Sequence, residues 1–489
     1  MTARLALLVL VVSSALGVGA VSAAPVCSDQ LAGINERCPD WVASYSHTGR
    51  GGRDEDIGRD LALGPDGSTV YVTGQSRDDA TGDDQAVVAV DAATGTTRWV
   101  GRYDATGSFD TGSSVAVAPD GARVFVTGRS VGGDGSFDWA TVAYDAATGA
   151  RLWDARYATP GMDRTWGVAP SPDGETVFVA GESDGGDIAA VAYDAATGEL
   201  RWEATYDNGG HELALDIGVA PDGATVYAAG TSGAPVTGTD LVVVAFRAVA
   251  EGEDEAGSIR WVSRLDGGSR TAETFAGFDV DAGDGTLAIA GFTNGDTQTL
   301  TAVIEPASGA ERWRALAAGY PGDGDHRDSV AVGGGRVVRI ARITTSTESS
   351  WQFSTVAYDA EDGSVAWTAE QGTEPFIKDV AKSVALSPDG ARVFVSGYSV
   401  VPYGETNGLR IEPGKITTVA YDAASGTRRW VAQHNQSGVG ADFPTALAVS
   451  PDGGRLFVGG TFITSGVFVW PTDLSMAYAY DFGVVAYDT

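Results

Sequence analysis

The sequence predicts an all-β fold, an eight-bladed β-propeller whose blades are four-stranded antiparallel sheets. Three observations predict this fold. Tryptophans recur every 49 to 63 residues, short apolar runs bounded by turn residues fill each interval, and no stretch keeps a helical period. Four short strands per unit, repeated radially, are typical of propeller blades.

Each repeat presents its elements in the same order. The second unit starts with Trp99–Tyr103, continues with Val115–Gly121, which ends in Pro-Asp-Gly, and adds the strands Val124–Gly128 and Thr141–Asp145. Pro-Asp-Gly suits a tight hairpin because proline presets φ and glycine accepts a positive φ. The tryptophans that recur in this way, which we predict to be structural, are Trp41, Trp99, Trp153, Trp202, Trp261, Trp313, Trp367 and Trp430.

The two ends of the repeat region complement each other. The first strand is Trp41–Tyr45, and the last unit ends at Val484–Asp488, one strand short of a blade. We therefore predict that the N-terminal strand is the outermost strand of the last blade, which closes the ring and removes two open sheet edges. The predicted domains are a signal peptide at 1–23, a leader at 24–40 and the propeller at 41–489.

The first 23 residues have the pattern of an export signal. Arg4 precedes the apolar run Leu5–Val12, which is too short to span a bilayer, and small residues precede the expected cut after Ala23. We therefore expect a secreted, extracellular protein with no transmembrane segment. A lipid anchor on Cys27 is not expected, because the aliphatic residue of a lipoprotein signal is missing three positions earlier. Cys27 and Cys38 are predicted to form a disulfide within the leader.

The charge of the chain is strongly negative. Asp and Glu number 65 and Lys and Arg 32, for a net charge of −33, and the lysines are only Lys378, Lys382 and Lys415. Such a field repels phosphate backbones, so nucleic acid is not an expected partner. Anionic membrane surfaces are disfavoured for the same reason. We expect a monomer with a protein or glycan ligand.

One motif points to a known family. Residues Ala89–Trp99 follow the pattern A-x-D-x-x-T-G-x-x-x-W, as do Ala143–Trp153 and Ala192–Trp202; Ala357–Trp367 and Ala420–Trp430 match with one or two changes. This motif resembles the tryptophan-docking motif of the quinoprotein-alcohol-dehydrogenase-like propellers, or PQQ-like repeats, and the Pro-Asp-Gly half resembles the YVTN repeat. The resemblance covers about residues 41–489. It implies tryptophan rings wedged between blades, with Thr-Gly forming a turn.

The resemblance does not imply the quinone cofactor. Dehydrogenases of this family use an adjacent Cys-Cys disulfide over the quinone, with carboxylate and amide ligands for calcium. Cys27 and Cys38 both precede the blades, and no haem-attachment Cys-x-x-Cys-His is present. The family also contains non-catalytic members, including an outer-membrane assembly scaffold. We therefore expect a non-enzymatic binding scaffold that requires no cofactor and has no catalytic residues. The alternative is a PQQ- and calcium-dependent oxidoreductase with an atypical site.

Carboxylates recur in register with the repeats. If the strands of each blade are numbered outward from the central axis, with the tryptophan strand fourth and outermost, one set precedes the first strand and comprises Asp56, Asp110, Asp163, Glu212, Asp379 and Asp442. A second precedes the third strand and comprises Asp84, Asp138, Asp187, Asp240 and Asp481, with Gln298, Gln352 and Lys415 at that position in repeats 5 to 7. Both sets are expected on one rim. Their repetition favours loop capping through backbone N–H groups over a cation-binding face.

Calcium remains an open possibility at two less regular places. Asp323, Asp325 and Asp328 concentrate oxygen ligands, and so does the acidic insertion Glu251–Glu255. The histidines, His47, His211, His326 and His434, are expected in loops on one face but are dispersed around the ring. Gly128–Gly132 matches the string G-x-S-x-G but leads into a Gly-rich loop rather than a helix, so we expect no nucleophile elbow there.

Symmetry is broken in the last two repeats. The connections Tyr398–Gly414 and Phe462–Tyr480 are long and contain aromatic residues that do not repeat elsewhere. Such side chains can stack on sugars or anchor partner side chains, whereas the alternative is a plug folded over the central channel. The candidate ligand-binding residues are Tyr403, Glu405, Arg410, Phe468, Trp470 and Tyr478.

Overall fold

The computed structural model describes most of the chain. The described ranges are 37–47, 55–78, 80–105, 107, 109–133, 135–234, 238–252, 254–267, 272–293, 297–320, 328–344, 351–372, 378–400, 414–435, 442–467 and 477–489. Within these ranges every regular element is a β-strand and no helix occurs. The fold is thus all-β, as predicted. The predicted signal peptide and most of the leader lie outside the described residues.

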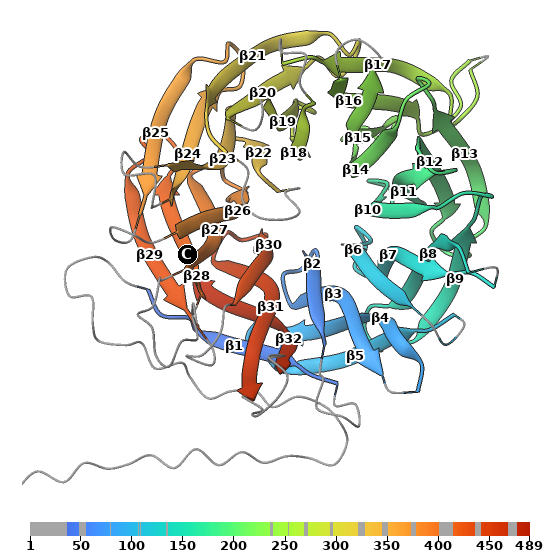
Figure 1. The fold of residues 1–489 in the computed structure, drawn as a ribbon, viewed down its shortest axis with the longest axis horizontal. Coiled ribbons are helices and arrows are strands. Elements are labelled where there is room, and N and C mark those ends of the chain that lie inside the picture. Colours follow the sequence, from blue (N-terminus) through green and yellow to red (C-terminus); the bar gives the residue numbers. More distant parts are fainter. Residues whose placement is uncertain are drawn as a thin grey trace, which may run out of the picture.

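The strands form antiparallel sheets that are arranged radially about a central axis (Figure 1). We number the repeats by their first strand, so that repeat 1 is β2–β5 and repeat 7 is β26–β29. Repeat 8 comprises β30, β31 and β32 together with β1. Because each sheet is roughly edge-on to the axis, its first strand lines the centre and its last strand lies on the outside, as in a β-propeller.

The first, innermost strands are β2 (Ile57–Leu63), β6 (Asp110–Val117), β10 (Arg164–Pro170), β14 (Glu212–Val219), β18 (Thr274–Val280), β22 (Val330–Gly333), β26 (Lys378–Leu386) and β30 (Phe443–Val449). The second strands are β3 (Thr69–Asp78), β7 (Arg123–Val131), β11 (Thr176–Ser183), β15 (Thr225–Ala234), β19 (Leu287–Thr293), β23 (Arg336–Thr344), β27 (Arg392–Val400) and β31 (Arg455–Val467).

The third strands are β4 (Gly82–Asp91), β8 (Phe137–Asp145), β12 (Asp187–Asp194), β16 (Gly238–Arg247), β20 (Gln298–Ile304), β24 (Trp351–Asp359), β28 (Gly414–Asp422) and β32 (Ala477–Asp488). The outermost strands are β5 (Thr97–Tyr103), β9 (Arg151–Tyr157), β13 (Leu200–Tyr206), β17 (Ile259–Leu265), β21 (Glu311–Ala318), β25 (Val365–Gln371), β29 (Arg428–His434) and β1 (Trp41–Tyr45).

Six of the sheets have four strands, and repeats 6 and 7 are joined into one eight-stranded sheet. A single parallel pair, Trp351 with Lys378, makes this join. In repeat 8 the N-terminal strand β1 pairs antiparallel with β32, with Trp41 opposite Ala486 and Tyr45 opposite Phe482. The first and last strands of the described chain therefore lie side by side.

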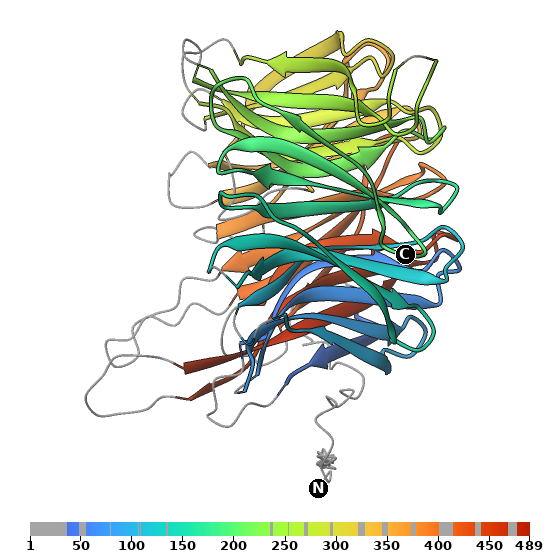
Figure 2. The same cartoon turned by 90° about the vertical axis from the view of Figure 1, so that its right-hand side faces the viewer.

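The two ends of the sheets differ in character. The Pro-Asp-Gly and Thr-Gly turns lie on one face, which we call the turn face. The connections between second and third strands, and those between successive repeats, lie on the opposite face, which we call the loop face (Figure 2). In the Thr-Gly turn of repeat 1, Asp91 Oδ1 accepts hydrogen bonds from the backbone N–H and the hydroxyl of Thr94 at 2.9 and 2.8 Å.

The recurring tryptophans join neighbouring repeats. The indole N–H of Trp99 donates to the carbonyl of Ala146 in the next repeat at 2.9 Å. The same bond recurs from Trp153 to Ala195 at 3.1 Å and from Trp367 to Ala423 at 2.8 Å. The others of this kind start from Trp41, Trp202, Trp261 and Trp313. Trp430 instead packs against Phe394 and Tyr487.

The same irregularity in strand pairing recurs in most of the innermost strands. Seven of the eight skip one residue in their pairing with the second strand, which makes a β-bulge. The bulged residues are Arg59, Ser113, Trp166, Leu215, Ala276, Lys382 and Thr445. A glycine faces each bulge, and in repeat 2 a Cβ on Gly128 would overlap the carbonyl oxygen of Thr111. The first glycine of the G-x-S-x-G string thus has a packing role.

Candidate functional site

A pocket lies at the centre of the ring, where the bulges occur. Five of the seven bulged residues line one pocket of about 450 Å³: Arg59, Ser113, Trp166, Lys382 and Thr445. A β-bulge changes the direction in which its side chain points. In five of the repeats the bulged residue lines this pocket. Sequence reasoning missed this site, because these five residues share neither a type nor a motif.

Aromatic side chains form part of the pocket wall. Trp166 comes from β10, Tyr398 from β27 and Phe443 from β30. The rings of Tyr398 and Phe443 are perpendicular with centroids 5.2 Å apart, and Phe443 is 36% exposed. Such edge-to-face pairing fixes the rings and leaves an apolar surface at the mouth. Tyr398 is the first residue of the long connection predicted to bind a ligand.

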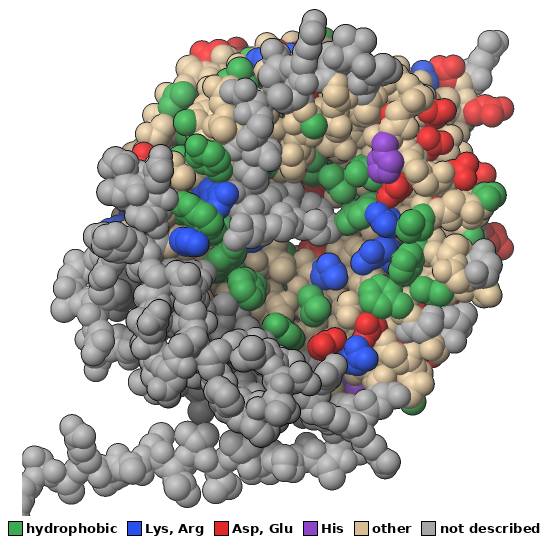
Figure 3. Space-filling model, in the orientation of Figure 1, with side chains coloured by type: hydrophobic (Ala, Val, Ile, Leu, Met, Phe, Trp, Pro, Cys, Tyr) green, Lys and Arg blue, Asp and Glu red, His purple; other side chains and the backbone are tan. Residues whose placement is uncertain are grey.

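Cations accompany these rings. The Lys382 ammonium lies 5.9 Å from the centroid of Tyr398. At the loop-face end of the same strand, Lys378 lies 4.8 Å from the centroid of Trp351, and the Arg342 guanidinium lies 3.9 Å from it. Figure 3 shows Lys and Arg side chains together with hydrophobic ones around the centre of this face, and many Asp and Glu side chains toward its rim.

Three aspartates also line the pocket: Asp60, Asp216 and Asp328. Asp60 accepts backbone N–H bonds from Leu61 at 2.8 Å and from Val115 of the next repeat at 2.9 Å. Asp216 accepts one from Ile217 at 2.7 Å. Asp60 therefore links two inner strands as well as facing the pocket.

A second pocket continues along the axis toward the turn face. It has a volume of about 660 Å³ and shares Asp60 and Asp328 with the first pocket. Asp279 in its wall is half-buried and accepts backbone N–H bonds from Val280 and Val332 at 2.8 and 2.7 Å. Burial raises the pKa of Asp279 to about 6, although these hydrogen bonds act in the opposite direction.

The acids that precede the first strands accept backbone hydrogen bonds from their loops. Asp56 accepts the backbone N–H of His47 at 2.7 Å, Asp163 that of Thr159 at 2.6 Å and Asp110 that of Ala105 at 3.3 Å. These contacts are those of loop caps. Burial raises the pKa of Asp56 to about 6.

The second set of acids was expected before the third strands, but Asp84, Asp138 and Asp240 lie within strands β4, β8 and β16. These acids are matched by arginines. Asp84 pairs with Arg102 at 2.8 Å, Asp138 with Arg156 at 2.6 Å and Asp240 with Arg264 at 2.8 Å. Each arginine follows the recurring tryptophan by three positions. The Trp-x-x-Arg spacing in the sequence indicates these ion pairs, but the spacing was not among the motifs considered above.

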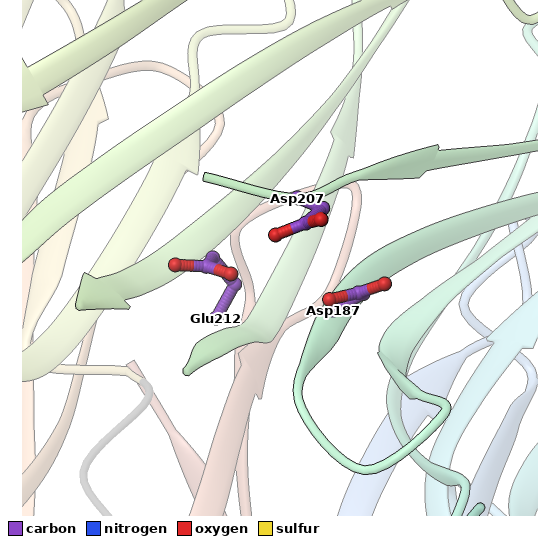
Figure 4. Close-up of side chains that lie close together, drawn as sticks. All are labelled: Asp187, Asp207 and Glu212. Atoms are coloured by element: carbon purple, nitrogen blue, oxygen red, sulfur yellow. The ribbon is translucent and has the colours of Figure 1, made fainter. Parts of the chain in front are cut away.

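Repeat 3 lacks this arginine, because Thr205 takes its place. Its acid, Asp187, lies with Asp207 and Glu212, and one carboxylate oxygen of each is within 4.8 Å of the others (Figure 4). Burial raises the pKa of Asp187, and the charges of Asp207 and Glu212 raise it further. Among the described residues, a similar group is Asp240, Asp266 and Glu273. Three carboxylates at this spacing could ligate a divalent cation.

Of the residues predicted to bind calcium, those that the structure describes belong to neither of these groups. Asp323 and Asp325 lie outside the described residues, and Asp328 faces the central pockets, where the Ser383 hydroxyl is 3.4 Å away. In the acidic insertion, Asp254 pairs with Arg247 at 2.7 Å and Glu251 pairs with Arg260. These two described acids thus have arginine partners.

The predicted ligand-binding residues are largely undescribed. Tyr403, Glu405, Arg410, Phe468 and Trp470 lie outside the described residues, and Tyr478 is in β32 with its side chain undescribed. Cys27 also lies outside them, so its disulfide with Cys38 stays a prediction. His326 is likewise outside.

The described histidines are dispersed, as predicted. His47 contacts Asp78 at 2.9 Å and His211 contacts Glu182 at 3.3 Å. His434 was expected in a loop, but it ends strand β29 and is buried beside Phe462. Ser130 of the G-x-S-x-G string lies within β7 and accepts a hydrogen bond from Arg156 at 2.6 Å. It is therefore on no strand-to-helix turn.

The sequence also lacks the adjacent Cys-Cys pair that the family dehydrogenases use over the quinone. Its only cysteines are Cys27, which lies outside the described residues, and Cys38, which is not among the residues of the pocket wall. Of the described carboxylate groups that could hold a metal, neither includes a residue of that wall. The residues around the pocket therefore do not fit the quinone and calcium site expected from the resemblance, and we derive no step through that cofactor.

A comparison with protein families places the chain. The model of a PQQ-like family described as outer membrane protein assembly factor BamB matches residues 138–229 and 296–477, which together exceed half of the chain. The chain belongs to this PQQ-like propeller family. Among curated proteins, none matches this chain. No helix in the described residues is long and apolar enough to cross a membrane.

Solved structures share the fold at low identity. Chaetomium thermophilum Sqt1, bound to the N-terminus of ribosomal protein L10, has a TM-score of 0.55 at 11% identity, covering 89% of this chain and 97% of that one. The Dos1 propeller has a TM-score of 0.54 at 11% identity, with 91% of this chain and 93% of that one covered. The quinohemoprotein alcohol dehydrogenase ADHIIG from Pseudomonas putida HK5 has a TM-score of 0.51 at 16% identity, with 89% of this chain and 76% of that one covered. These similarities show the fold alone.

Proposed function

We propose that this PQQ-like propeller is a non-enzymatic binding scaffold whose ligand is a glycan seated in the 450 Å³ pocket of the loop face. The main support for this proposal is that the bulged residues of five repeats line the same pocket. They are Trp166, Lys382, Arg59 and two small residues with hydroxyl groups, Ser113 and Thr445. Sugar rings stack on aromatic faces, and their hydroxyls need polar partners. The pocket offers both kinds of contact.

The long connections of repeats 7 and 8 would complete this site. Tyr398 and Thr461, both in the pocket wall, lie at or just before the start of these connections. A ligand in the pocket would therefore lie at the base of both. We propose that Tyr403 and Trp470 extend the contact surface. The alternative in which the connections are a plug predicts that their loss affects stability rather than binding.

The test is a glycan-binding screen on the mature protein, followed by calorimetry with the best ligand. We expect Trp166→Ala to weaken binding at least tenfold while the melting temperature changes little, because Trp166 is a bulged residue on the pocket wall. Leu200→Ala removes an exposed side chain of β13 on the outside of the ring and is the control. Loss of stability with unchanged binding for Tyr403→Ala/Trp470→Ala would support the plug and contradict the proposed contact surface.

We also propose that the ring has eight blades and is closed by β1. The pairing of β1 with β32 supports closure. The separation of repeats 6 and 7 is supported by the pairing of their strands at only one position in the described residues, Trp351 with Lys378. The export signal at 1–23 supports secretion, which detection of the mature protein outside the cell, with Met1–Ala23 removed, would test. Retention of residues 1–23 would contradict it.

A further inference from the structure

A buried arginine between repeats 5 and 6 points to an ion site that is separate from the central pocket and independent of glycan binding. Arg339 of β23 is 1% exposed, and neither its Nε nor its Nη1 has a hydrogen-bond partner. Burial lowers its pKa, and Tyr358 rather than a carboxylate acts in the opposite direction. The guanidinium is therefore a buried positive charge without a counter-charge from the described part of the chain.

The side chains around Arg339 are apolar. Successive residues of a strand point to opposite faces, so Arg339 shares its face of β23 with Val337 and Ala341. Both belong to a buried cluster at the interface of repeats 5 and 6 that also contains Phe292 and Trp313. Such surroundings do not replace the hydration that the guanidinium loses on burial.

The same interface departs from the repeat pattern on its other side. Ala288 of β19 belongs to this cluster and stands where the second strands of other repeats have an aromatic residue. Those aromatic residues are Tyr71, Phe125, Phe178, Tyr227, Phe394 and Phe457. At the interface of repeats 1 and 2, the positions of Ala288 and Arg339 hold Tyr71 and Val126, which share one cluster. An aromatic residue and a valine are thus replaced by an alanine and an arginine.

This double replacement leaves space beside the guanidinium. Alanine and arginine together have fewer side-chain atoms than an aromatic residue and a valine, yet they occupy the equivalent interface. Because protein interiors are close-packed, the difference is room for a small buried species. A water molecule could fill such a space, but it would not balance the charge.

A hydroxyl group without a partner lies on the facing repeat. Thr301 of β20 is fully buried, and its Oγ1 has no hydrogen-bond partner. The residue opposite it on β19 is Ala290. The threonines at the same position in repeats 2 and 7 instead have hydroxyl partners on the second strand, Thr127 and Ser396. Repeat 5 thus leaves this hydroxyl free to donate across the interface.

Arg339 reaches the strand that carries this hydroxyl. A Cβ placed on Gly319 would lie 3.4 Å from Arg339 Nη1 and 2.9 Å from Thr299 Cγ2. Thr299 and Thr301 are two residues apart and therefore point to the same face of β20. The guanidinium and the hydroxyl of Thr301 accordingly face the same interface between the two repeats.

We infer that a small monovalent anion, of the size and charge of chloride, binds between repeats 5 and 6 and accepts hydrogen bonds from Arg339 and the Thr301 hydroxyl. A guanidinium has only donors, and a hydrogen bond between charged groups is about twice as strong as a neutral one. The anion provides the counter-charge that the surrounding apolar side chains lack. Because the interface is buried, a small ion is favoured over a larger ligand.

The experiment measures urea unfolding at constant ionic strength while chloride replaces gluconate, an anion too large for the interface. For the wild type we expect the unfolding equilibrium constant to fall about tenfold for each tenfold rise in chloride above the dissociation constant, because unfolding releases one ion. Arg339→Val should lack this dependence, and its stability should exceed that of the wild type most in gluconate. Arg336→Val is the control, which removes an arginine paired with Asp359 on the same strand and should keep the chloride dependence.

Thr301→Val and bromide provide two further checks, which also apply if Arg339→Val does not fold. Thr301→Val keeps the branched shape without the hydroxyl and should shift the dependence to higher chloride concentrations. Bromide in crystals should give an anomalous-scattering peak beside Arg339 Nη1. The inference is overturned if Arg339→Val responds to chloride as the wild type does, if the wild type does not respond, or if no bromide peak is found there. Each of these results leaves glycan binding to be decided by Trp166→Ala.

Discussion

Gly149 lies over the indole ring of Trp99 so closely that a Cβ placed on it would be 2.6 Å from ring atom Cδ2. The same contact joins Gly95 to Trp41 and Gly363 to Trp313. The glycine of each Thr-Gly turn thus has two reasons to be glycine: a positive φ, which is 72° at Gly149, and the ring of the preceding repeat.

We expect Gly149→Ala to lower the free energy of unfolding by about 1–2 kcal/mol for its backbone conformation and by about 1–3 kcal/mol more for the clash with Trp99. Gly209→Ala is the control, because Gly209 has a φ of 78° but nothing within 4 Å of a built Cβ. Denaturant unfolding of both variants measures the difference. Equal losses would show that the contact with the tryptophan is unimportant.

Repeat 6 contains a buried cation. Arg339 is 1% exposed, and its Nε and Nη1 have no hydrogen-bond partner. Burial lowers its pKa. The corresponding positions in repeats 2, 3 and 7 are Val126, Val179 and Val395. A buried guanidinium without an acidic partner costs free energy, because its desolvation is not offset.

We therefore expect Arg339→Val to raise the free energy of unfolding by about 1–4 kcal/mol. Arg336→Val removes an arginine from the same strand whose partner is the partly exposed Asp359, and should change stability by less than about 1 kcal/mol. Thermal and denaturant unfolding provide the measurement. A loss of stability in Arg339→Val would mean that Tyr358, its neighbour, depends on the guanidinium.

Because repeat 3 lacks the arginine found in repeats 1, 2 and 4, introducing one should stabilise the fold. Thr205→Arg would place a guanidinium beside Asp187 and its acidic neighbours, as Arg264 lies beside Asp240. We expect a gain of about 0.5–1 kcal/mol in dilute salt that decreases as ionic strength rises, because the site is partly exposed. Thr205→Met, which adds a stem without charge, is the control. A gain that persists in 1 M salt or appears equally in Thr205→Met would contradict an electrostatic origin.

His434 should make the fold sensitive to acid. Burial lowers its pKa to about 4, so the unfolded chain binds a proton on this imidazole near pH 6.5 while the folded chain does not. The free energy of unfolding therefore falls as the pH falls from 6.5 toward 4, by about 2 kcal/mol between pH 7 and pH 5 for this group.

The acids Asp56 and Asp279 act in the opposite direction. Their pKa values, raised to about 6, make the folded state more stable as pH falls. Their contribution is common to the wild type and His434→Gln and cancels in the comparison. We expect the wild type to lose about 2 kcal/mol more than His434→Gln between pH 7 and pH 5, as measured by denaturant unfolding at each pH. Parallel losses would contradict a neutral buried imidazole.

The elements that repeat along the chain could be predicted because each appears several times in the sequence. The strand Trp41–Tyr45 and the turn after Val115 have the predicted positions, and the tryptophans contact the next repeat. Capping by Asp56 and Asp163 followed from the preference of aspartate for loop N–H groups.

The pocket could not be predicted in the same way. Arg59, Trp166 and Lys382 occupy equivalent positions of their strands only because a bulge occurs in each, and a bulge has no fixed residue type. The burial of Arg339 could not be predicted either. It replaces a single valine of the repeat, so the alternation of apolar residues along the strand is almost unchanged. Such features depend on register and on contacts between distant repeats.

The pairing of Trp41 with Ala486 has a consequence for biosynthesis. Strand β1 is among the first described parts of the chain to be translated, and its partner β32 is among the last. The backbone groups of β1 remain without their sheet partner until β32 has been translated. Contacts this distant in sequence slow folding and leave incomplete species prone to aggregation. The final sheet can thus assemble only after β32 has left the ribosome.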